Sequence, residues 1–402
     1  MLTDARRLRS GTPLWLANGS TRLAVQRHLP ADRPDVAVVG TGISGALMAD
    51  ALLSAGLSVL AIDRRQPMTG SSPASTALLQ SELDVPFTTL RRTAGRSVAT
   101  RVWHRSAQAV QALSDRIIDL SLDCDLVLRN SLYFPGNLLD VSGLKDEAAA
   151  RREVGLRSRF LARKDLLRFA GLKRAGAIST AGNAEANPVK LTAGLWRHFI
   201  KQGGRMVTAA DVVDLDHSRS AVRLELADGR KLTARRVVFC TGYELMKFAR
   251  PRGYKISSTW VIATKPQPKR LWPSRSLLWE AADPYLYMRS TLDGRIIAGG
   301  ENEPFSDAQQ RDAMTPLKMK KIAKKAGKLI PVADFTVDFA WSGSFGESAT
   351  GLPAFGEIPG MPRCYAVLGF GGNGITFSML AAQMISRTIL GVSDPDAELF
   401  AL

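Results

Sequence analysis

Three glycines and one acid near the start of the chain have the types and spacing needed to bind a dinucleotide. Gly40, Gly42 and Gly45 follow the apolar run Val36–Val39 in the order G-x-G-x-x-G. In such a turn the first glycine permits the bend, the second lets backbone N–H groups approach a pyrophosphate, and the third lets the following helix pack closely. Asp63 stands 18 residues after Gly45, where a carboxylate can accept hydrogen bonds from both hydroxyls of an adenosine ribose.

The residues around this pattern extend the predicted nucleotide site. Ile43 and Ser44 begin the helix after the turn, and a helix N-terminus is a favourable place for a phosphate. Arg64 and Arg65 follow Asp63, and arginine at this point can also face a ribose 2′-phosphate. Because Asp63 would repel such a phosphate, we expect an unphosphorylated adenosine ribose.

A second glycine-rich turn lies near the end of the chain. The stretch YAVLGFGGNGITFSMLAAQ runs from an apolar strand through Gly371, Gly372 and Gly374 into a helix. This helix N-terminus could stabilise negative charge on an electron-rich group, which need not be a phosphate.

Two further stretches could approach the same ligand. The segment QPMTGSSPASTALLQSELDVP is rich in small hydroxyl residues, including Ser75 and Thr76. The apolar run VVFC ends in a turn at Thr241 and Gly242, and the carboxyl end of a strand is where an open α/β sheet places its ligand.

The elements that must position these residues predict an α/β protein. Strand–turn–helix units surround both glycine turns, which is typical of a Rossmann-like, dinucleotide-binding domain. Residues 250–335 alternate instead in the manner of antiparallel strands, followed by a basic amphipathic helix at 318–330. We also expect helices over 91–120 and 146–171. The sequence therefore predicts a second, mainly antiparallel-sheet domain that binds the substrate.

Composition limits the alternatives. The 402 residues include 54 Lys and Arg against 37 Asp and Glu, a net charge of 54 − 37 = +17. Such an excess favours acidic partners such as nucleic acid, although we interpret the basic clusters as solvated helix faces. Three cysteines without C-x-x-C spacing predict reduced thiols, and the four histidines show no ligand spacing, so we expect no metal. Without an apolar stretch long enough to span a bilayer, we expect a cytoplasmic protein.

Taken in order, the motifs resemble those of the D-amino acid oxidase (DAO) family of FAD-dependent oxidoreductases, which includes glycine oxidase and sarcosine oxidase. The matching pieces are VAVVGTGISG with Asp63, SPASTALLQ, VVFCTGYE, YLYMRSTLDGRIIAGGE, WSGSFGESATGLPAFG and GFGGNGITFS. They span residues 36 to 385. The resemblance implies an FAD-binding domain made of residues 1–100, 181–250 and 336–402, with a substrate domain made of 101–180 and 251–335.

The resemblance also implies which residues contact the cofactor. The ADP half of FAD would lie on the first glycine turn, with the strand at Val212 against the adenine edge. The hydroxyl segment would approach the pyrophosphate and flavin, and the last glycine loop would lie under the isoalloxazine. The implied cofactor residues are Gly40, Gly42, Ile43, Ser44, Gly45, Asp63, Arg64, Ser75, Thr76, Val212, Thr241, Gly242, Gly371, Gly372, Asn373, Gly374, Ile375 and Thr376. Tyr285 stands near the place of the flavin-linked cysteine of covalent sarcosine oxidases, so we expect noncovalent FAD.

For the substrate, the resemblance implies oxidation of the C–N bond of an amino acid or amine by hydride transfer to flavin N5. Arg289 falls where glycine oxidase has an arginine that binds the substrate carboxylate, and guanidinium suits a bidentate carboxylate. Tyr287 is on the same face of the predicted strand and could line the flavin. Weaker candidates are Gln80, Trp341, Glu301 and Lys255.

Two other functions stay open on the sequence. The positive charge would suit a flavoenzyme that oxidises a modified wobble uridine of tRNA. A flavin-binding subunit of a dehydrogenase complex, inactive alone, would share the same motifs. The electron acceptor, oxygen or another compound, and the oligomeric state are not readable from these residues.

Overall fold

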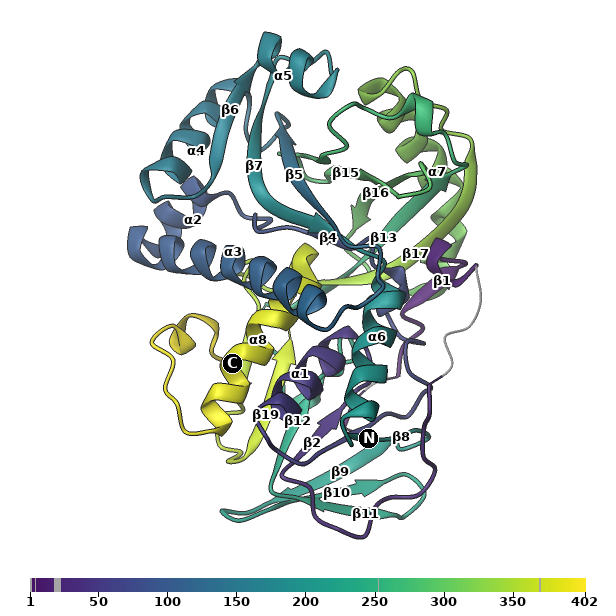
Figure 1. Cartoon of the computed structure of the whole chain (residues 1–402), viewed down its shortest axis with the longest axis vertical. Helices are drawn as coiled ribbons and strands as arrows, with labels where there is room; N and C mark the ends of the chain where they lie inside the picture. The colour runs from purple at the N-terminus through teal and green to yellow at the C-terminus, as the bar shows by residue number, and fades with distance from the viewer. Residues whose placement is uncertain (1, 4, 18–22, 252, 369) are drawn as a thin grey trace.

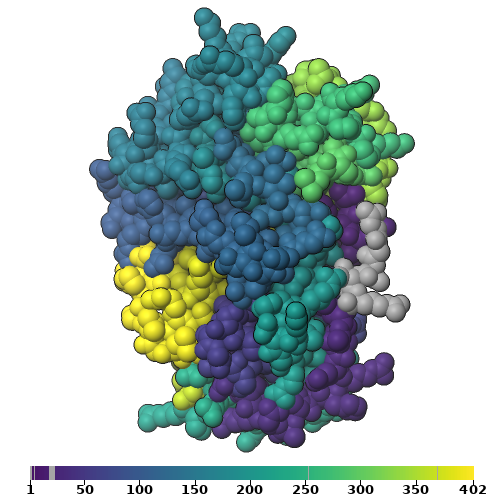
Figure 2. Space-filling model, in the orientation of Figure 1, coloured from purple at the N-terminus to yellow at the C-terminus, as the bar shows by residue number. Residues whose placement is uncertain are grey.

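Two large β-sheets organise the molecule. The computed structural model describes residues 2–3, 5–17, 23–251, 253–368 and 370–402. A six-stranded sheet and its helices form the lower half in Figure 1, and a larger sheet forms the upper half. The space-filling view shows that the two halves are in broad contact (Figure 2). At this contact the residues of helix α3 (Arg96–Asp119) lie above the C-terminal segment.

The smaller sheet has the strand order β18-β19-β12-β2-β3-β8. Every neighbouring pair is parallel except β18 and β19. The glycine turns and Asp63 follow β2, β3 and β19, so they meet at one edge, the carboxyl edge of the parallel strands. The strands are β2 (Val36–Val39), β3 (Val59–Ile62), β8 (Arg205–Val207), β12 (Arg236–Phe239), β18 (Ala354–Glu357) and β19 (Cys364–Leu368).

Both faces of this sheet are covered, which explains its continuous apolar strands. Val36 and Val38 face a core shared with α1 (Ile43–Ser54), α6 (Pro188–Lys201) and α8 (Gly374–Ile389). Ala37 and Val39 face the opposite core, shared with a small antiparallel sheet. That sheet contains β9 (Val212–His217), β10 (Val222–Leu226) and β11 (Lys231–Ala234).

The larger sheet is mainly antiparallel and has ten strands. Nine of them follow the order β1-β17-β13-β16-β15-β14-β5-β7-β4, and the tenth, β6, pairs with β7. The pairing of β14 with β5 is parallel. The strands are β1 (Arg9–Gly11), β4 (Leu78–Leu79), β5 (Val127–Phe134), β6 (Ser158–Ala162), β7 (Gly176–Glu185), β13 (Lys255–Thr264), β14 (Leu277–Glu280), β15 (Leu286–Ser290), β16 (Ile296–Glu303) and β17 (Val337–Glu347).

Helices cover the larger sheet. Ile322 and Ala326 of α7 (Ala308–Leu329) pack on Trp260 and Met288, while the other face of β15 points toward the smaller sheet. The helices α2 (Phe87–Ala94), α3 and α4 (Val141–Glu153) pack together beside β7 at the left of Figure 1. Helix α5 comprises Arg163–Ala170.

The predicted fold class, an α/β protein with a Rossmann-like domain and a mainly antiparallel second domain, is confirmed. Some elements differ from the expectation. The stretch 146–171, expected to be helical, contains strand β6, and helix α7 begins ten residues before 318 and continues through Pro316. Strands β1 and β17 belong to the larger sheet, because β1 pairs with β17 and β17 pairs with β13. The sequence had placed residues 1–100 and 336–402, which contain these strands, in the FAD-binding domain.

Candidate functional site

One deep cavity between the two sheets contains most of the predicted site residues. Its empty volume is about 1580 Å³, counting the open mouth. Both glycine turns line it. The predicted wall residues are Gly40, Gly42, Ile43, Ser44, Asp63, Ser75, Thr76, Thr241, Gly242, Tyr287, Gly371, Gly372, Asn373, Gly374 and Ile375.

The first glycine turn has the close contacts that its spacing predicts. Gly40 has φ +113°, and a Cβ there would lie 2.3 Å from the carbonyl oxygen of Cys240. A Cβ on Gly45 would lie 1.8 Å from the carbonyl oxygen of Gly40, so a side chain would push α1 off strand β2. Gly42 faces the cavity, beside the hydroxyl of Ser72. The backbone of this turn is therefore open to a ligand.

Asp63 lies in the cavity wall at the end of β3. Its carboxylate accepts hydrogen bonds from the Thr41 backbone N–H at 2.7 Å, the Thr41 hydroxyl at 2.8 Å and the Arg65 backbone N–H at 2.8 Å. Burial raises the pKa of this carboxyl above its ordinary value, against the opposing effect of these bonds. The bonds hold the acid at the glycine turn.

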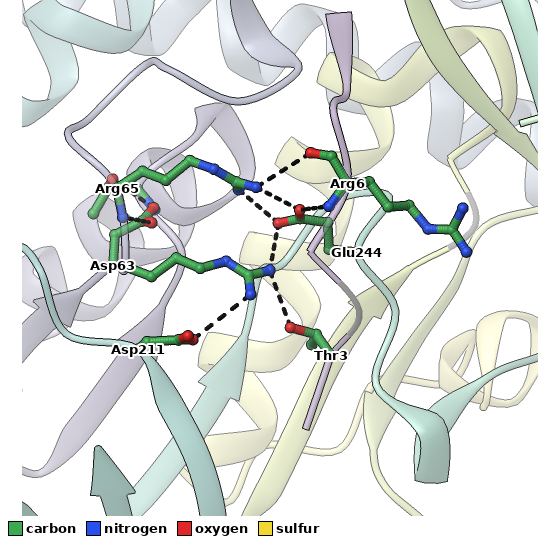
Figure 3. Close-up of polar contacts among 8 residues, drawn as sticks. Thr3, Arg6, Asp63, Arg65, Asp211 and Glu244 are labelled. Atoms are coloured by element: carbon green, nitrogen blue, oxygen red, sulfur yellow. Dashed lines mark hydrogen bonds and ion pairs between the residues drawn. The ribbon is translucent and has the colours of Figure 1, made fainter. Parts of the chain in front are cut away.

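A carboxylate that the sequence did not single out, Glu244, neutralises the arginines after Asp63. Its oxygens accept both terminal nitrogens of Arg65, at 2.5 and 2.6 Å, and one nitrogen of Arg64 at 2.6 Å. The backbone N–H of Arg6 donates to it at 2.6 Å (Figure 3). Burial alone would raise the pKa of Glu244, but these donors outweigh it and lower the pKa. Its one sequence signal was its place in the turn TGYE.

The second glycine loop is tied to the extended segment at residues 80–84. The Asn373 amide donates to the carbonyl oxygen of Glu82, and the Thr376 hydroxyl donates to that of Gln80 at 3.1 Å. The backbone N–H of Gly372 donates to the Asp84 carboxylate at 2.7 Å. This network places the side chains of residues 80, 82 and 84 in the cavity wall.

Aromatic side chains line the cavity where the larger sheet meets it. Tyr285 and Tyr287 have ring centroids 5.7 Å apart, and Tyr243 meets Phe370 edge-on at 6.4 Å. Trp279 of β14 completes this part of the wall. Burial raises the pKa of Tyr287 to about 12, so its hydroxyl stays protonated at neutral pH. Tyr287 lines the cavity, and its predicted contact with the flavin stays a prediction.

Arg289 does not lie in the cavity wall. Two residues after Tyr287 on β15, it is displaced roughly 7 Å along the strand, and its guanidinium is buried elsewhere. One nitrogen donates to the carbonyl oxygen of Ala186 at 2.8 Å, another lies 3.6 Å from the Glu185 carboxylate, and the ring of Trp15 lies 5.0 Å away. The predicted carboxylate contact is not supported by this position, because the side chain is engaged in the protein interior.

Other predicted residues act from outside the wall. Gly45 and Thr376 shape the helix starts behind it. Arg64 and Val212 line a small adjoining cavity next to Gly40, and contact of Val212 with an adenine stays a prediction. Among the weaker candidates, Gln80 lines the main cavity. The Trp341 indole donates to Ala74 at 2.9 Å, Glu301 pairs with lysines of α7, and Lys255 is exposed.

The cavity thus joins the glycine turns of the smaller, Rossmann-like sheet to strands of the larger sheet. Residues 35–388 match the family DAO, described as FAD dependent oxidoreductase. The chain belongs to this family, and the resemblance in its motifs is confirmed.

Several known proteins are similar to this chain at low sequence identity. The "Probable oxidoreductase OrdL" of Haemophilus influenzae is 20% identical over 378 residues, covering 90% of this chain and 84% of that protein. Glycine oxidase from Geobacillus kaustophilus has a TM-score of 0.74 at 19% identity, covering 92% of this chain and 98% of that one. L-amino acid deaminase from Proteus myxofaciens reaches 0.77 at 14%, covering 99% of both chains. These structures share the fold.

The described residues fit the FAD that the family requires. Four buried polar atoms of wall residues have no hydrogen-bond partner within the described chain and are free for a ligand: the Thr241 hydroxyl, the Gln80 side-chain nitrogen, the Trp279 indole nitrogen and the Asn302 side-chain oxygen. A Cβ on Gly42 or Gly372 would come within 3 Å of wall side-chain atoms. Burial raises the pKa of the Cys240 thiol, the one cysteine among the described wall residues.

The described residues contain no group of three or more His, Cys, Asp or Glu side chains arranged to hold a metal ion. None of their helices is both long and apolar enough to cross a membrane. Cys124, Cys240 and Cys364 are free and buried.

Proposed function

We propose that this protein oxidises the C–N bond of an amine or amino acid to an imine, using noncovalently bound FAD. The observation that carries the proposal is the meeting of both glycine turns in one cavity between the sheets. Bound FAD supplies a two-electron acceptor. The first turn and Asp63 would hold its ADP half, and the loop at 371–376 would hold the ring system at the N-terminus of α8.

The protein side chains would orient the substrate and exclude water rather than provide a strong base. Tyr287, Tyr285 and Trp279 form an aromatic wall from the larger sheet. Such a wall holds an amine against the cofactor in a dry environment, where orientation and loss of water favour the reaction. The buried Cys240 thiol, with its raised pKa, is a poor nucleophile, which favours noncovalent attachment.

Anaerobic reduction of the bound flavin tests the proposal. The purified holoprotein is mixed without oxygen with amines and with both enantiomers of amino acids, and bleaching of the flavin absorbance near 450 nm is followed. We expect at least one compound to bleach the flavin. Acid precipitation should release all FAD into the supernatant. A broad panel that never bleaches the flavin would favour a binding subunit, and flavin that stays with the pellet would contradict noncovalent attachment.

A further inference from the structure

The charged side chains in the cavity wall are mostly acidic. Among the described residues of the wall, Asp63, Glu82, Asp84 and Glu244 are acids, and Arg65 is the one base. Arg65 lies at the nucleotide end and is held by both oxygens of Glu244. The opposite end, beside the second glycine loop, therefore has carboxylates and no cationic side chain from the described chain.

Of the two acids at this end, Asp84 has an oxygen left for a ligand. The Glu82 carboxylate accepts the Ser131 hydroxyl and the Asn183 amide, the latter at 3.1 Å. Asp84 accepts the Gly372 N–H through one oxygen, and its other oxygen accepts no hydrogen bond from the described residues. The side chain is half-buried and faces the cavity. Its second oxygen is therefore available to a ligand in the cavity.

The hydroxyl of one aromatic residue, Tyr285, lies close to this carboxylate. A Cβ built on Gly372 would lie 2.8 Å from an Asp84 oxygen and 3.1 Å from the Tyr285 hydroxyl, so both groups approach the same point of the loop. Tyr287 is the next ring, with its centroid 5.7 Å from that of Tyr285. A carboxylate with tyrosine side chains near it can bind an ammonium ion, through charge and cation–π attraction.

The same arrangement disfavours a substrate carboxylate. Arg289, the residue expected to bind one, is buried against Ala186 and Glu185 outside the wall. A carboxylate entering this end would meet the like charge of Asp84 without a described cation to offset it. The neutral donors nearby, such as the Trp279 indole N–H, do not remove that repulsion.

We propose that the end of the cavity beside the second glycine loop recognises the ammonium group of an amine that has no carboxylate on the carbon next to its nitrogen. In this proposal Asp84 is the anionic contact, and Tyr285 and Tyr287 lie near it. The inference rests on the proposed function and narrows its substrate class. The ammonium must lose a proton before its C–N bond is oxidised, and the Asp84 oxygen that holds it can accept this proton, leaving the neutral amine. Burial raises the pKa of Asp84, which favours that transfer.

A pair of ligands that cannot be oxidised tests the recognition. Phenyltrimethylammonium and benzoate are similar in shape and opposite in charge, and the cation has no lone pair to support oxidation. Each is titrated into the holoprotein by calorimetry and by the change in flavin absorbance. We expect the cation to bind at least tenfold more tightly than benzoate. Equal binding, or tighter binding of benzoate, would overturn the inference.

Variants locate the contact. Asp84→Asn should weaken binding of the cation at least tenfold and leave benzoate binding unchanged or stronger. Glu347→Gln is the matched control, because Asp84 lies near enough to Glu347 to raise the pKa of the Glu347 carboxyl, yet Glu347 lies outside the wall, and its substitution should change cation binding less than threefold. If both variants weaken the cation equally, Asp84 is not the contact. If Asp84→Asn does not fold, Tyr285→Leu should still weaken the cation about threefold, and unchanged binding would contradict the aromatic site.

A second matched pair separates this inference from the proposed function. Benzylamine and phenylglycine differ by a carboxylate on the reacting carbon, and both are tested for anaerobic flavin bleaching. Faster bleaching by benzylamine supports both proposals. Bleaching by phenylglycine alone, with weak cation binding, would overturn the ammonium site and keep the oxidoreductase. Tight, Asp84-dependent cation binding without bleaching by any amine or amino acid would keep the site and overturn the oxidation.

Discussion

Glu244 sets the charge at the nucleotide end of the cavity. Two arginines directly follow Asp63, and unpaired they would attract an additional phosphate. Glu244 instead holds Arg65 through two hydrogen bonds and Arg64 through one, and Asp211 lies 3.6 Å from Arg64. With both guanidinium groups engaged, a ribose 2′-phosphate would find its nearest cations occupied. An unphosphorylated adenosine ribose therefore stays our prediction.

Replacing Arg289 by Ala should reduce stability and leave ligand binding unchanged. Among the described residues, the substitution leaves the buried Glu185 carboxylate with Arg129 alone as partner, at 3.0 Å. Removing one member of a buried ion pair costs about 3 kcal/mol or more. We expect a loss of this size in the free energy of unfolding measured in urea, with less than a twofold change in benzoate affinity.

Arg168→Ala is the matched control for this prediction, because Arg168 is 82% exposed and pairs with Asp165 on the surface of α5. A surface pair contributes about 0–1 kcal/mol, so this variant should unfold almost as the wild type does. A large loss of benzoate affinity in Arg289→Ala, at unchanged stability, would restore the carboxylate-binding role of Arg289.

At the scale of elements, the packing of α1 on β2 depends on the absence of a side chain at residue 45. A Cβ there would lie 1.8 Å from the Gly40 carbonyl oxygen, and backbone cannot move aside as a flexible side chain can. We expect Gly45→Ala to lower the free energy of unfolding by about 3 kcal/mol and to reduce FAD content on purification. Urea denaturation and the ratio of flavin to protein absorbance measure the two effects.

The matched control for this substitution is Gly327→Ala in helix α7. A Cβ at Gly327 would meet a carbon of Phe335 at 3.7 Å, an ordinary contact. Alanine is the better helix former, so this variant should be more stable by roughly 0.5–1 kcal/mol and retain its flavin. Full flavin occupancy in Gly45→Ala would show that α1 can shift without opening the nucleotide site.

Elements that depend on short stretches of sequence were predictable, and those that depend on distant pairing were not. The unit β2–turn–α1 is encoded within about thirty residues, so its glycine positions and helix start were correct. Strand β7 is flanked by β5 and β6, and β17 by β1 and β13, and nothing local specifies those partners. The position of Arg289 follows from where β15 crosses the sheet, and Asp84 had no motif that marked it before Gly372 was placed beside it.

For the whole molecule, a ligand that touches both sheets should stabilise both in one transition. The cavity has walls from β15 and β17 as well as from the turns after β2 and β19. A ligand at a thousandfold excess over its Kd stabilises the folded state by about 4 kcal/mol. We expect removal of FAD to lower the Tm of a single calorimetric transition, and re-addition to restore it.

ADP is the control for this experiment, since it fills only the nucleotide end and should restore part of the Tm. Two separate transitions, of which one ignores FAD, would contradict a cofactor held jointly by both sheets.

Some of the basic residues behind the net charge of +17 are buried, although we expected the basic clusters to form solvated helix faces. Arg151 is fully buried, bonded to Glu147 at 2.7 Å and 4.4 Å from the ring of Trp103. Lys318 is also buried, 3.5 Å from Glu301. Other lysines of α7 are exposed, among them Lys320, Lys324 and Lys328. Part of the positive charge is therefore structural, and tRNA binding stays a prediction that salt-dependent titration can test.

The pairing of β1 with β17 has a consequence for the order in which this protein matures. Arg9 pairs with Gly343, and Leu8, the residue before, lies in the same cavity wall as Gly343. During translation the first of these residues leaves the ribosome more than three hundred residues before the second. That part of the wall therefore closes only when synthesis is nearly finished, and a nascent chain lacking residue 343 has an incomplete chamber for its flavin.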